Sequence, residues 1–303
     1  MEKEDYTMNY SPLRYPGGKN KLAPFIALLI KKAAIENSIY VEPFAGGSGV
    51  ALSLLLNSVV DEIVINDYDK AIYSMWRALL TETDRFIALI ETVPVNIDEW
   101  RNQKRIYDEQ STKYSLELGF AAFYLNRTNR SGILSNAGPI GGFDQTGNYL
   151  IDARFNRQEL IRRVQKIAEH KSKIHLYNKD IRSFLKSYMP KYQKCAFVYF
   201  DPPYFKKGKA LYKNFFSPTD HQEIFNLIKD LKCPWIVTYD DVPQIRKIYS
   251  SHTCKRYDLI YSLANNGKNS ELMFLSDDSL WPSNDELKEA KVVINLRGEN
   301  DGK

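Results

Sequence analysis

The stretch AFVYFDPPY, residues 196–204, decides the fold of this chain. Its first five residues are apolar, β-branched or aromatic, which predicts a short buried strand. The two prolines end that strand because neither has a backbone N–H for the sheet. The carboxylate of Asp201 and the ring of Tyr204 should therefore lie at a strand's carboxyl end, where open α/β sheets place their ligands. A carboxylate, a proline carbonyl and an aromatic ring suit a planar base that carries an amino group.

Apolar runs of the same kind recur along the chain with helical segments between most of them. They cover residues 39–41, 63–65, 174–177 and 235–238, and they end near Glu42, Asp67, Asp180 and Tyr239-Asp240-Asp241. This alternation predicts a doubly wound, Rossmann-like α/β fold with a mostly parallel sheet. The sequence SPTD at 217–220 predicts a capped helix start in the last of these units.

Residues 79–166 interrupt the alternation, which predicts an inserted domain that is mainly helical. Helices are expected over 98–110 and 116–125, and Asn156 with Glu159 suggests a capping box that restarts a helix. Residues 132–149 are rich in Gly, Asn and Pro, which predicts a long loop or a β-hairpin. We therefore expect a discontinuous catalytic domain at 1–78 and 167–282, a target-recognition insertion at 79–166, and a charged tail at 283–303.

The composition of the 303 residues narrows the class of protein. No stretch approaches the roughly 20 apolar residues that a membrane helix needs, and the start of the chain shows no signal-peptide pattern, so we expect an intracellular, cytoplasmic protein. Three scattered cysteines and four histidines show no metal-ligand spacing, so no metal site is expected. The net charge of +5 permits a nucleic-acid partner without establishing one.

A glycine-rich loop follows the first predicted strand. Glu42, Phe44, Gly46 and Gly47 lie there, and Asp67 ends the next strand roughly 20 residues later, where an acidic side chain commonly binds ribose hydroxyls. The loop has neither the dinucleotide pattern nor a P-loop lysine, so an adenosine ligand without a pyrophosphate fits better than a dinucleotide. The alternative is a tight strand–helix turn with no ligand.

The sequence YPGGK at 15–19 lies near the start of the chain. Its paired glycines and Lys19 can wrap a small anion, and Tyr15 can pack on a planar ring. A plain surface turn explains it equally, and a structural turn is likewise the alternative for Asp201–Tyr204.

The motifs at 15–19, 42–47, 67 and 201–204 occur in an order that resembles the Dam-like (alpha-group) site-specific DNA adenine-N6 methyltransferases. In this family the cofactor motif comes first, the target-recognition domain second and the catalytic motif third. The resemblance covers residues 11–282. It extends to LNRTNRSG at 125–132, which is similar to the start of the family's DNA-reading segment, and to NGK at 266–268 with Glu271-Leu272.

The resemblance implies a class I methyltransferase fold and S-adenosyl-L-methionine as cofactor. Asp67 would bind the ribose, Asp180 the cofactor adenine, and Tyr15 with Lys19 the methionine end. The cofactor-binding residues that it implies are Tyr15, Gly17, Gly18, Lys19, Glu42, Phe44, Gly46, Gly47, Asp67, Asp180 and Asp201.

The resemblance also implies that a target adenine flips out of double-stranded DNA, because its amine is out of reach inside the duplex. Tyr204 would stack on the base, and Asp201 and the Pro202 carbonyl would accept the amine hydrogens. The catalytic residues are then Asp201, Pro202, Pro203 and Tyr204. The expected DNA-binding residues are Asn126, Arg127, Asn129, Arg130 and Arg154, whereas Arg162, Arg163 and Lys166 could be only a solvated helix face.

Some positions depart from the family pattern, and other functions remain open. Many relatives have tryptophan where Tyr15 stands and glycine where Ser48 stands, and residues after Gly132 differ from those of GATC-methylating members, which leaves the target sequence open. The alternatives are amine methylation of cytosine, RNA or protein, a catalytically silent DNA-binding protein, or a dinucleotide-dependent oxidoreductase. A monomer and a cognate restriction endonuclease partner are expected by resemblance.

Overall fold

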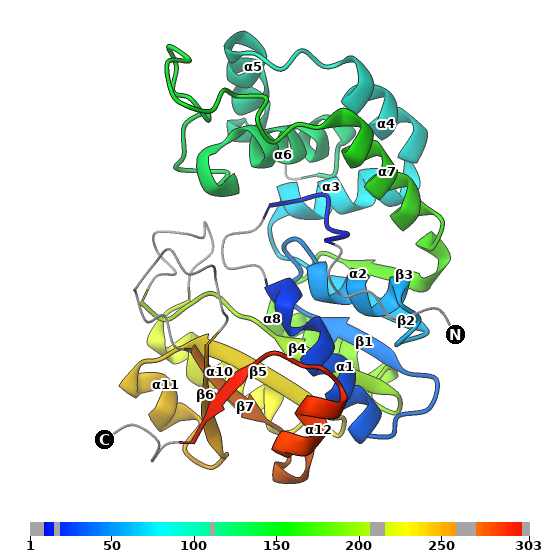
Figure 1. Cartoon of the computed structure of the whole chain (residues 1–303), viewed down its shortest axis with the longest axis vertical. Helices are drawn as coiled ribbons and strands as arrows, with labels where there is room; N and C mark the ends of the chain where they lie inside the picture. Colours follow the sequence, from blue (N-terminus) through cyan, green and yellow to red (C-terminus); the bar gives the residue numbers. More distant parts are fainter. Residues whose placement is uncertain (1–8, 15–18, 110–112, 207–215, 259–270, 299–303) are drawn as a thin grey trace.

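The computed structural model describes residues 9–14, 19–109, 113–206, 216–258 and 271–298. The described residues form one sheet of eight strands in the order β3-β2-β1-β4-β5-β7-β6-β8 (Figure 1). The strands are β1 (Ile39–Glu42), β2 (Glu62–Asn66), β3 (Ile174–Tyr177), β4 (Ala196–Phe200), β5 (Trp235–Asp240), β6 (Cys254–Asp258), β7 (Glu271–Leu275) and β8 (Asn295–Arg297). Neighbours among β1–β5 are parallel, and the β5–β7, β6–β7 and β6–β8 pairs are antiparallel.

The five predicted strands are confirmed, and the order of the sheet reverses between β1 and β4. The chain begins in the middle of the sheet, runs outward through β2 and β3, and then returns to β4 and β5 on the other side of β1. Such a reversal opens a crevice at the carboxyl ends of the strands, where doubly wound sheets bind their ligands.

Helices pack on both faces of the sheet, and further helices form the insertion. They are α1 (Ala23–Lys32), α2 (Gly49–Leu56), α3 (Lys70–Thr81), α4 (Thr83–Thr92), α5 (Ile97–Asp108), α6 (Leu116–Thr128), α7 (Arg157–Ala168), α8 (Ile181–Ser183), α10 (Pro218–Ile228), α11 (Pro243–Ile248) and α12 (Asn284–Glu289). Successive residues of β4 serve opposite faces: Phe197 and Tyr199 join one apolar core, and Val198 and Phe200 join the other. Burial on both faces is why this strand reads as a continuous apolar run.

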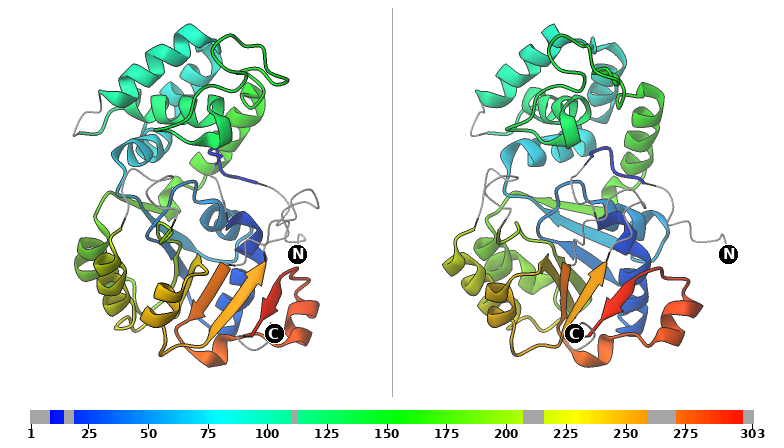
Figure 2. Two further views of the ribbon diagram at one scale, coloured as in Figure 1. Left: turned by 90° about the vertical axis from the view of Figure 1, so that its left-hand side faces the viewer. Right: turned by 60° about the vertical axis from the view of Figure 1, so that its left-hand side comes forward.

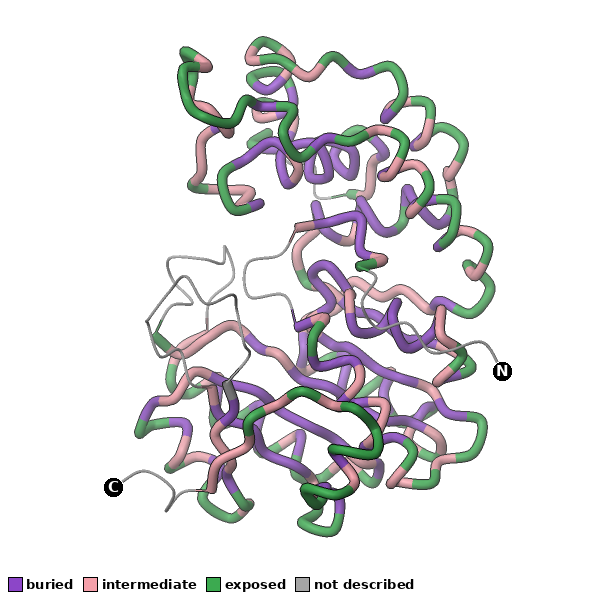
Figure 3. Tube along the Cα trace, in the orientation of Figure 1, coloured by how far each residue is buried: buried purple, intermediate pink, exposed green. Residues whose placement is uncertain are grey.

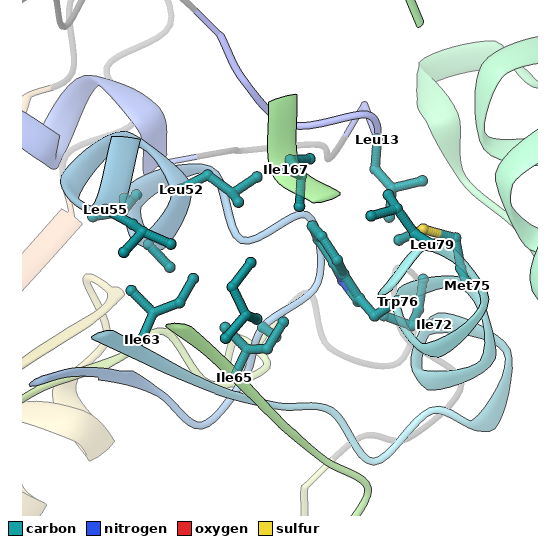
Figure 4. Close-up of a cluster of buried hydrophobic side chains, with 14 of the residues drawn as sticks. Leu13, Leu52, Leu55, Ile63, Ile65, Ile72, Met75, Trp76, Leu79 and Ile167 are labelled. Carbon is teal, nitrogen blue, oxygen red and sulfur yellow. The ribbon is translucent and has the colours of Figure 1, made fainter. Parts of the chain in front are cut away.

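The larger core joins the sheet to the first helices. Figure 4 shows Trp76 of α3 between the strand residues Ile63 and Ile65 and the helix residue Leu79. The indole N–H of Trp76 donates to the carbonyl of Gly46 at 2.9 Å, so the same side chain that fills the core also holds the glycine-rich loop.

The insertion is a group of helices, α4 to α7, that packs on α3. In the views of Figures 1 and 2 these helices lie at the end of the molecule opposite α11 and α12. Helix α6 is buried along almost its whole length, as the tube in Figure 3 shows. The predicted boundaries at 78/79 and 166/167 fall inside α3 and α7, so these two helices are shared by both parts of the chain.

Residues 132–149 form a long loop of turns, which is one of the two predicted alternatives, and the other alternative, a β-hairpin, is not seen there. The one isolated bridge described at this loop joins Asn129 to Pro139. The tail from 283 to 298 is ordered into α12 and β8, and β8 pairs with β6 at the edge of the sheet. Within the described residues no helix is both long and apolar enough to cross a bilayer.

Candidate active site

A cavity of about 770 Å³ lies at the reversal point of the sheet. Residues that follow four parallel strands meet in its wall: Glu42, Asp67, Asp180 and Asp201. Phe44, Gly46, Gly47, Lys19, Pro203 and Tyr204 also line it. The structure therefore brings most of the predicted cofactor and catalytic residues together, while Tyr15, Gly17 and Gly18 lie outside the described residues.

The glycine-rich loop is held by its neighbours in a turn that exposes its backbone to the cavity. Gly46 has a φ of 45°, which a glycine adopts without strain. Its N–H donates to Asp67 Oδ2 at 2.8 Å, and the carbonyl of Gly47 accepts from the hydroxyl of Ser11. The predicted pairing of this loop with Asp67 is thus a direct contact in the structure.

The carboxylate of Asp67 sits in a poorly solvated position. Burial and the neighbouring Asp69 raise its pKa to about 7, against the two backbone N–H groups of Gly46 and Asp69 that favour the ionised form. A carboxyl group whose pKa is raised by burial, in a cavity wall at the end of a strand, is a candidate binding residue.

Glu42 lies buried at the end of β1, 5% exposed. In the described structure its Oε2 has no hydrogen-bond partner, and the nearby hydroxyl of Tyr40 has none either. Burial and the charge of Asp201 raise the pKa of Glu42 well above its usual range. An unpartnered buried acceptor in a cavity wall is costly unless a ligand donates to it.

Asp201 is oriented from inside the sheet. Its Oδ1 accepts from the Thr238 hydroxyl at 3.1 Å, and Thr238 in turn contacts the hydroxyl of Tyr199 at 2.9 Å. Burial and the nearby Glu271 raise the pKa of Asp201 to about 6, although Lys19 acts in the opposite direction.

Lys19 and Glu271 hold the hydroxyl of Tyr204. Lys19 Nζ donates to Tyr204 Oη at 2.7 Å, contacts Glu271, and lies 3.9 Å from Asp201 Oδ1. Tyr204 Oη lies 2.7 Å from Glu271 Oε1, and the hydroxyl of Tyr257 also donates to Glu271. Lys19 therefore contacts the Asp201–Tyr204 segment directly in the structure.

Sequence reasoning missed several members of this site. Thr238 and Tyr257 carry no motif, and their place is set by strand register. Asp240 could have been predicted, because it is an acidic residue at the end of a parallel strand. Asp67 and Asp201 likewise come directly after the parallel strands β2 and β4. Asp180 lines the cavity as expected, but its Oδ1 also caps α8 by accepting the N–H groups of Arg182 and Ser183.

Two expected DNA contacts are wrong for this conformation. Asn126 and Asn129 are both 0% exposed. Asn126 bonds the backbone N–H and carbonyl of Arg14 and the carbonyl of Gly132, and Asn129 bonds the indole of Trp100 and the carbonyl of Ile133. Their amides satisfy buried backbone groups, so they shape the segment and are not available to read bases.

Two of the expected arginines, Arg127 and Arg154, lie with Arg14 and Arg163 in a positively charged cluster beside the cavity. Arg127 donates to the carbonyl of Arg154 at 2.8 Å, and burial together with the charges of Arg14, Arg163 and Arg154 lowers its pKa to about 9. Arg130 and Arg154 are exposed, and Arg14 lines the cavity. Arg162 and Lys166 pair with Glu159 and Glu169 about one helical turn away, as expected for a solvated helix face. Arg163 also pairs with Glu159, but its side chain is only 19% exposed and donates to the carbonyl of Ser11.

A doubly wound sheet with a cavity at its reversal point and Asp-Pro-Pro-Tyr at the carboxyl end of the central strand β4 defines a Rossmann-like α/β protein with a candidate ligand site. The family model for D12 class N6 adenine-specific DNA methyltransferases matches residues 15–263, which is most of the chain. The chain belongs to this family, and it methylates the N6 amine of adenine in DNA.

The comparisons also give one curated relative and one solved structure. The type II methyltransferase M.MjaIII of Methanocaldococcus jannaschii is 27% identical over 205 residues, which are 63% of this chain and 68% of the relative. The rRNA methyltransferase aviRa of Streptomyces viridochromogenes aligns over 92% of this chain and 95% of its own, with 11% identity and a TM-score of 0.41.

Proposed function

We propose that the methyl donor is S-adenosyl-L-methionine, held in the cavity between the glycine-rich loop and Asp201. Two observations support the fit. The carboxylate of Asp67 is fixed beside the loop, where it suits ribose hydroxyls, and the unpartnered Oε2 of Glu42 suits a cationic or N–H-bearing group. When bound, this donor supplies an electrophilic methyl group carried on a sulfonium.

The chain's own residues would prepare the amine. We propose that Tyr204 stacks on an adenine flipped from the duplex, a contact worth roughly 1–3 kcal/mol per base. Asp201 and the Pro202 carbonyl accept the two N–H groups of the amine, so its lone pair is less delocalised into the ring and points toward the methyl donor. Positioning and electrostatics then supply most of the rate.

The arginine cluster is our proposed contact to the DNA backbone. Arg127 is held among like charges, and that mutual repulsion is relieved when a phosphate binds. The exposed Arg130 and Arg154 extend the same positive surface away from the cavity. The buried Asn126 and Asn129 keep this segment in shape.

The biological setting follows from resemblance alone. The printed name of the curated relative is that of a type II methyltransferase. We propose that this chain acts as a monomer on cytoplasmic DNA of a bacterium or phage, beside a cognate restriction endonuclease. Sequencing of modified bases in a host that carries the gene would reveal the site and its setting.

The position of the Asp201 carboxylate, held by Thr238 at the carboxyl end of β4, is the single observation that carries the proposed chemistry. Asp201→Ala should lower the rate of methyl transfer from labelled S-adenosylmethionine to unmodified DNA by at least ~10²-fold, because a preorganised acceptor is lost. The exposed Asp98, which pairs with Arg101 on α5, provides a control as Asp98→Asn. Near-normal turnover in Asp201→Ala would refute the assignment.

A further inference from the structure

Two carboxylates on neighbouring strands contact the segment Tyr204–Lys206 at different points. Asp240 ends β5 and Glu271 begins β7, and the two residues are direct partners in the antiparallel register. Like charges placed directly opposite in a sheet are destabilising. Such a pair is tolerated where each member has donors of its own.

Asp240 takes its donors from the backbone that follows Tyr204. Its Oδ1 accepts from the N–H of Phe205 at 2.9 Å, and its Oδ2 accepts from the N–H of Lys206 at 3.0 Å. One side chain therefore fixes two successive peptide groups, and this sets the direction in which the chain leaves the Asp-Pro-Pro-Tyr motif.

Glu271 takes its donors from side chains, whereas Asp240 takes them from the backbone. It receives the hydroxyls of Tyr204 and Tyr257 and the ammonium of Lys19. The hydroxyl end of Tyr204 is thus fixed by β7, while the backbone next to its Cα is fixed by β5.

We propose that Asp240 and Glu271 are positioning residues for methyl transfer, which together hold the Tyr204 ring in the arrangement that receives the flipped base. This inference rests on the proposed role of Asp201–Tyr204. Neither carboxylate is assigned to the donor or to the base: each acts through the loop. Such support matters because a misplacement on the order of 1 Å can cost about 10² in rate.

Two substitutions test this role, with a neighbour as control. Asp240→Asn keeps the size of the side chain but leaves one of the two loop N–H groups facing an amide nitrogen, which cannot accept a hydrogen bond. Glu271→Gln removes the charge that faces Lys19. Asp241→Asn is the matched control, because Asp241 adjoins Asp240 yet pairs with Arg246 and Arg256 away from the loop.

The readouts separate positioning from folding. We expect Asp240→Asn and Glu271→Gln to lower the single-turnover methylation rate by about 10- to 100-fold, with donor affinity by calorimetry and KM for DNA near wild type. Asp241→Asn should lose thermal stability but keep the rate. In a Tyr204→Ala background the ring is absent, so Asp240→Asn should lower the methylation rate by a much smaller factor than it does in the wild type.

The outcomes distinguish this inference from the proposed function. Wild-type rates in both variants, with Asp201→Ala inactive, would overturn the positioning role and leave the proposed chemistry standing. An active Asp201→Ala would overturn both. If Asp240→Asn does not fold, Glu271→Gln still tests the positioning role from β7. If either substitution lowers the rate by the same factor in the Tyr204→Ala background as in the wild type, that result would contradict the positioning role.

Discussion

Ser48 adopts a left-handed backbone, with φ 45° and ψ 36°, directly before α2. This conformation is disfavoured for residues with a side chain, and such strain tends to collect at functional sites. Its N–H and its hydroxyl both donate to the carbonyl of Ala45, at 2.6 and 3.3 Å, which offsets part of the cost. The backbone geometry also explains why glycine suits this position in the relatives that the sequence resembles.

Asp201 should give the enzyme an acid limb in its pH profile. Its pKa is raised to about 6, chiefly by burial and also by Glu271, and only the ionised form keeps both oxygens as acceptors, one for the Thr238 hydroxyl and one for the amine. With the methyl donor saturating, kcat/KM for DNA should be flat above pH 7 and fall about tenfold per pH unit below pH 6.

The control for that profile is Asp201→Asn, whose residual rate should show no inflection near pH 6. Circular dichroism at each pH would show that the protein stays folded. A wild-type rate at pH 5 equal to that at pH 8 would contradict the role of an ionised Asp201.

At the scale of elements, the sequence predicts the parallel part of the sheet. The strands β1, β2, β4 and β5 are apolar runs because helices cover them on both sides. The strand β7 is equally apolar and buried, but it lies in the antiparallel part of the sheet, outside the predicted strand–helix alternation. The strand β6, with the sequence CKRYD, and the strand β8 lie toward the antiparallel edge, where charged side chains reach solvent and no such run arises. The same limit applies to the site: acidic strand ends were predictable, but the partners of Asp201 and Tyr204 depend on register.

The packing of α6 on α3 gives a prediction in which two effects oppose each other. A Cβ built on Gly119 would lie 2.5 Å from the carbonyl oxygen of Ser74, a backbone atom of α3. Alanine for glycine inside a helix normally gains about 1 kcal/mol, whereas overpacking costs typically about 1–3 kcal/mol. Because the clash is with backbone, we expect Gly119→Ala to lower the free energy of unfolding.

Urea denaturation would measure the effect of Gly119→Ala. The matched control is Gly138→Ala, because its nearest neighbour is Phe143 Cε2 at 4.0 Å and its change should stay within about 0.5 kcal/mol. A Gly119→Ala protein that is more stable than wild type would show that the two helices can move apart freely.

At the scale of the whole molecule, the insertion is fastened to the sheet domain by the segment that precedes the YPGGK sequence. The side-chain amide of Asn126 in α6 accepts from the backbone N–H of Arg14 and donates to its carbonyl. A Cβ on Gly132 would lie 2.3 Å from the same carbonyl oxygen. Asn126, which the sequence predicts as a DNA contact, thus joins the insertion to the sheet domain. The arginine cluster lies at this junction, next to the cavity.

That placement predicts how DNA affinity depends on salt. Each phosphate contact releases counterions, so the logarithm of affinity should fall linearly with the logarithm of salt concentration, with a slope of about −0.9 per contact. Arg130→Gln and Arg154→Gln should each make the slope shallower by about 0.9 if each arginine contacts one phosphate. Arg85→Gln is the control, because Arg85 is equally exposed but pairs with Glu82 on α4. Fluorescence anisotropy over a salt series measures the slopes, and unchanged slopes in both variants would place the DNA on another face.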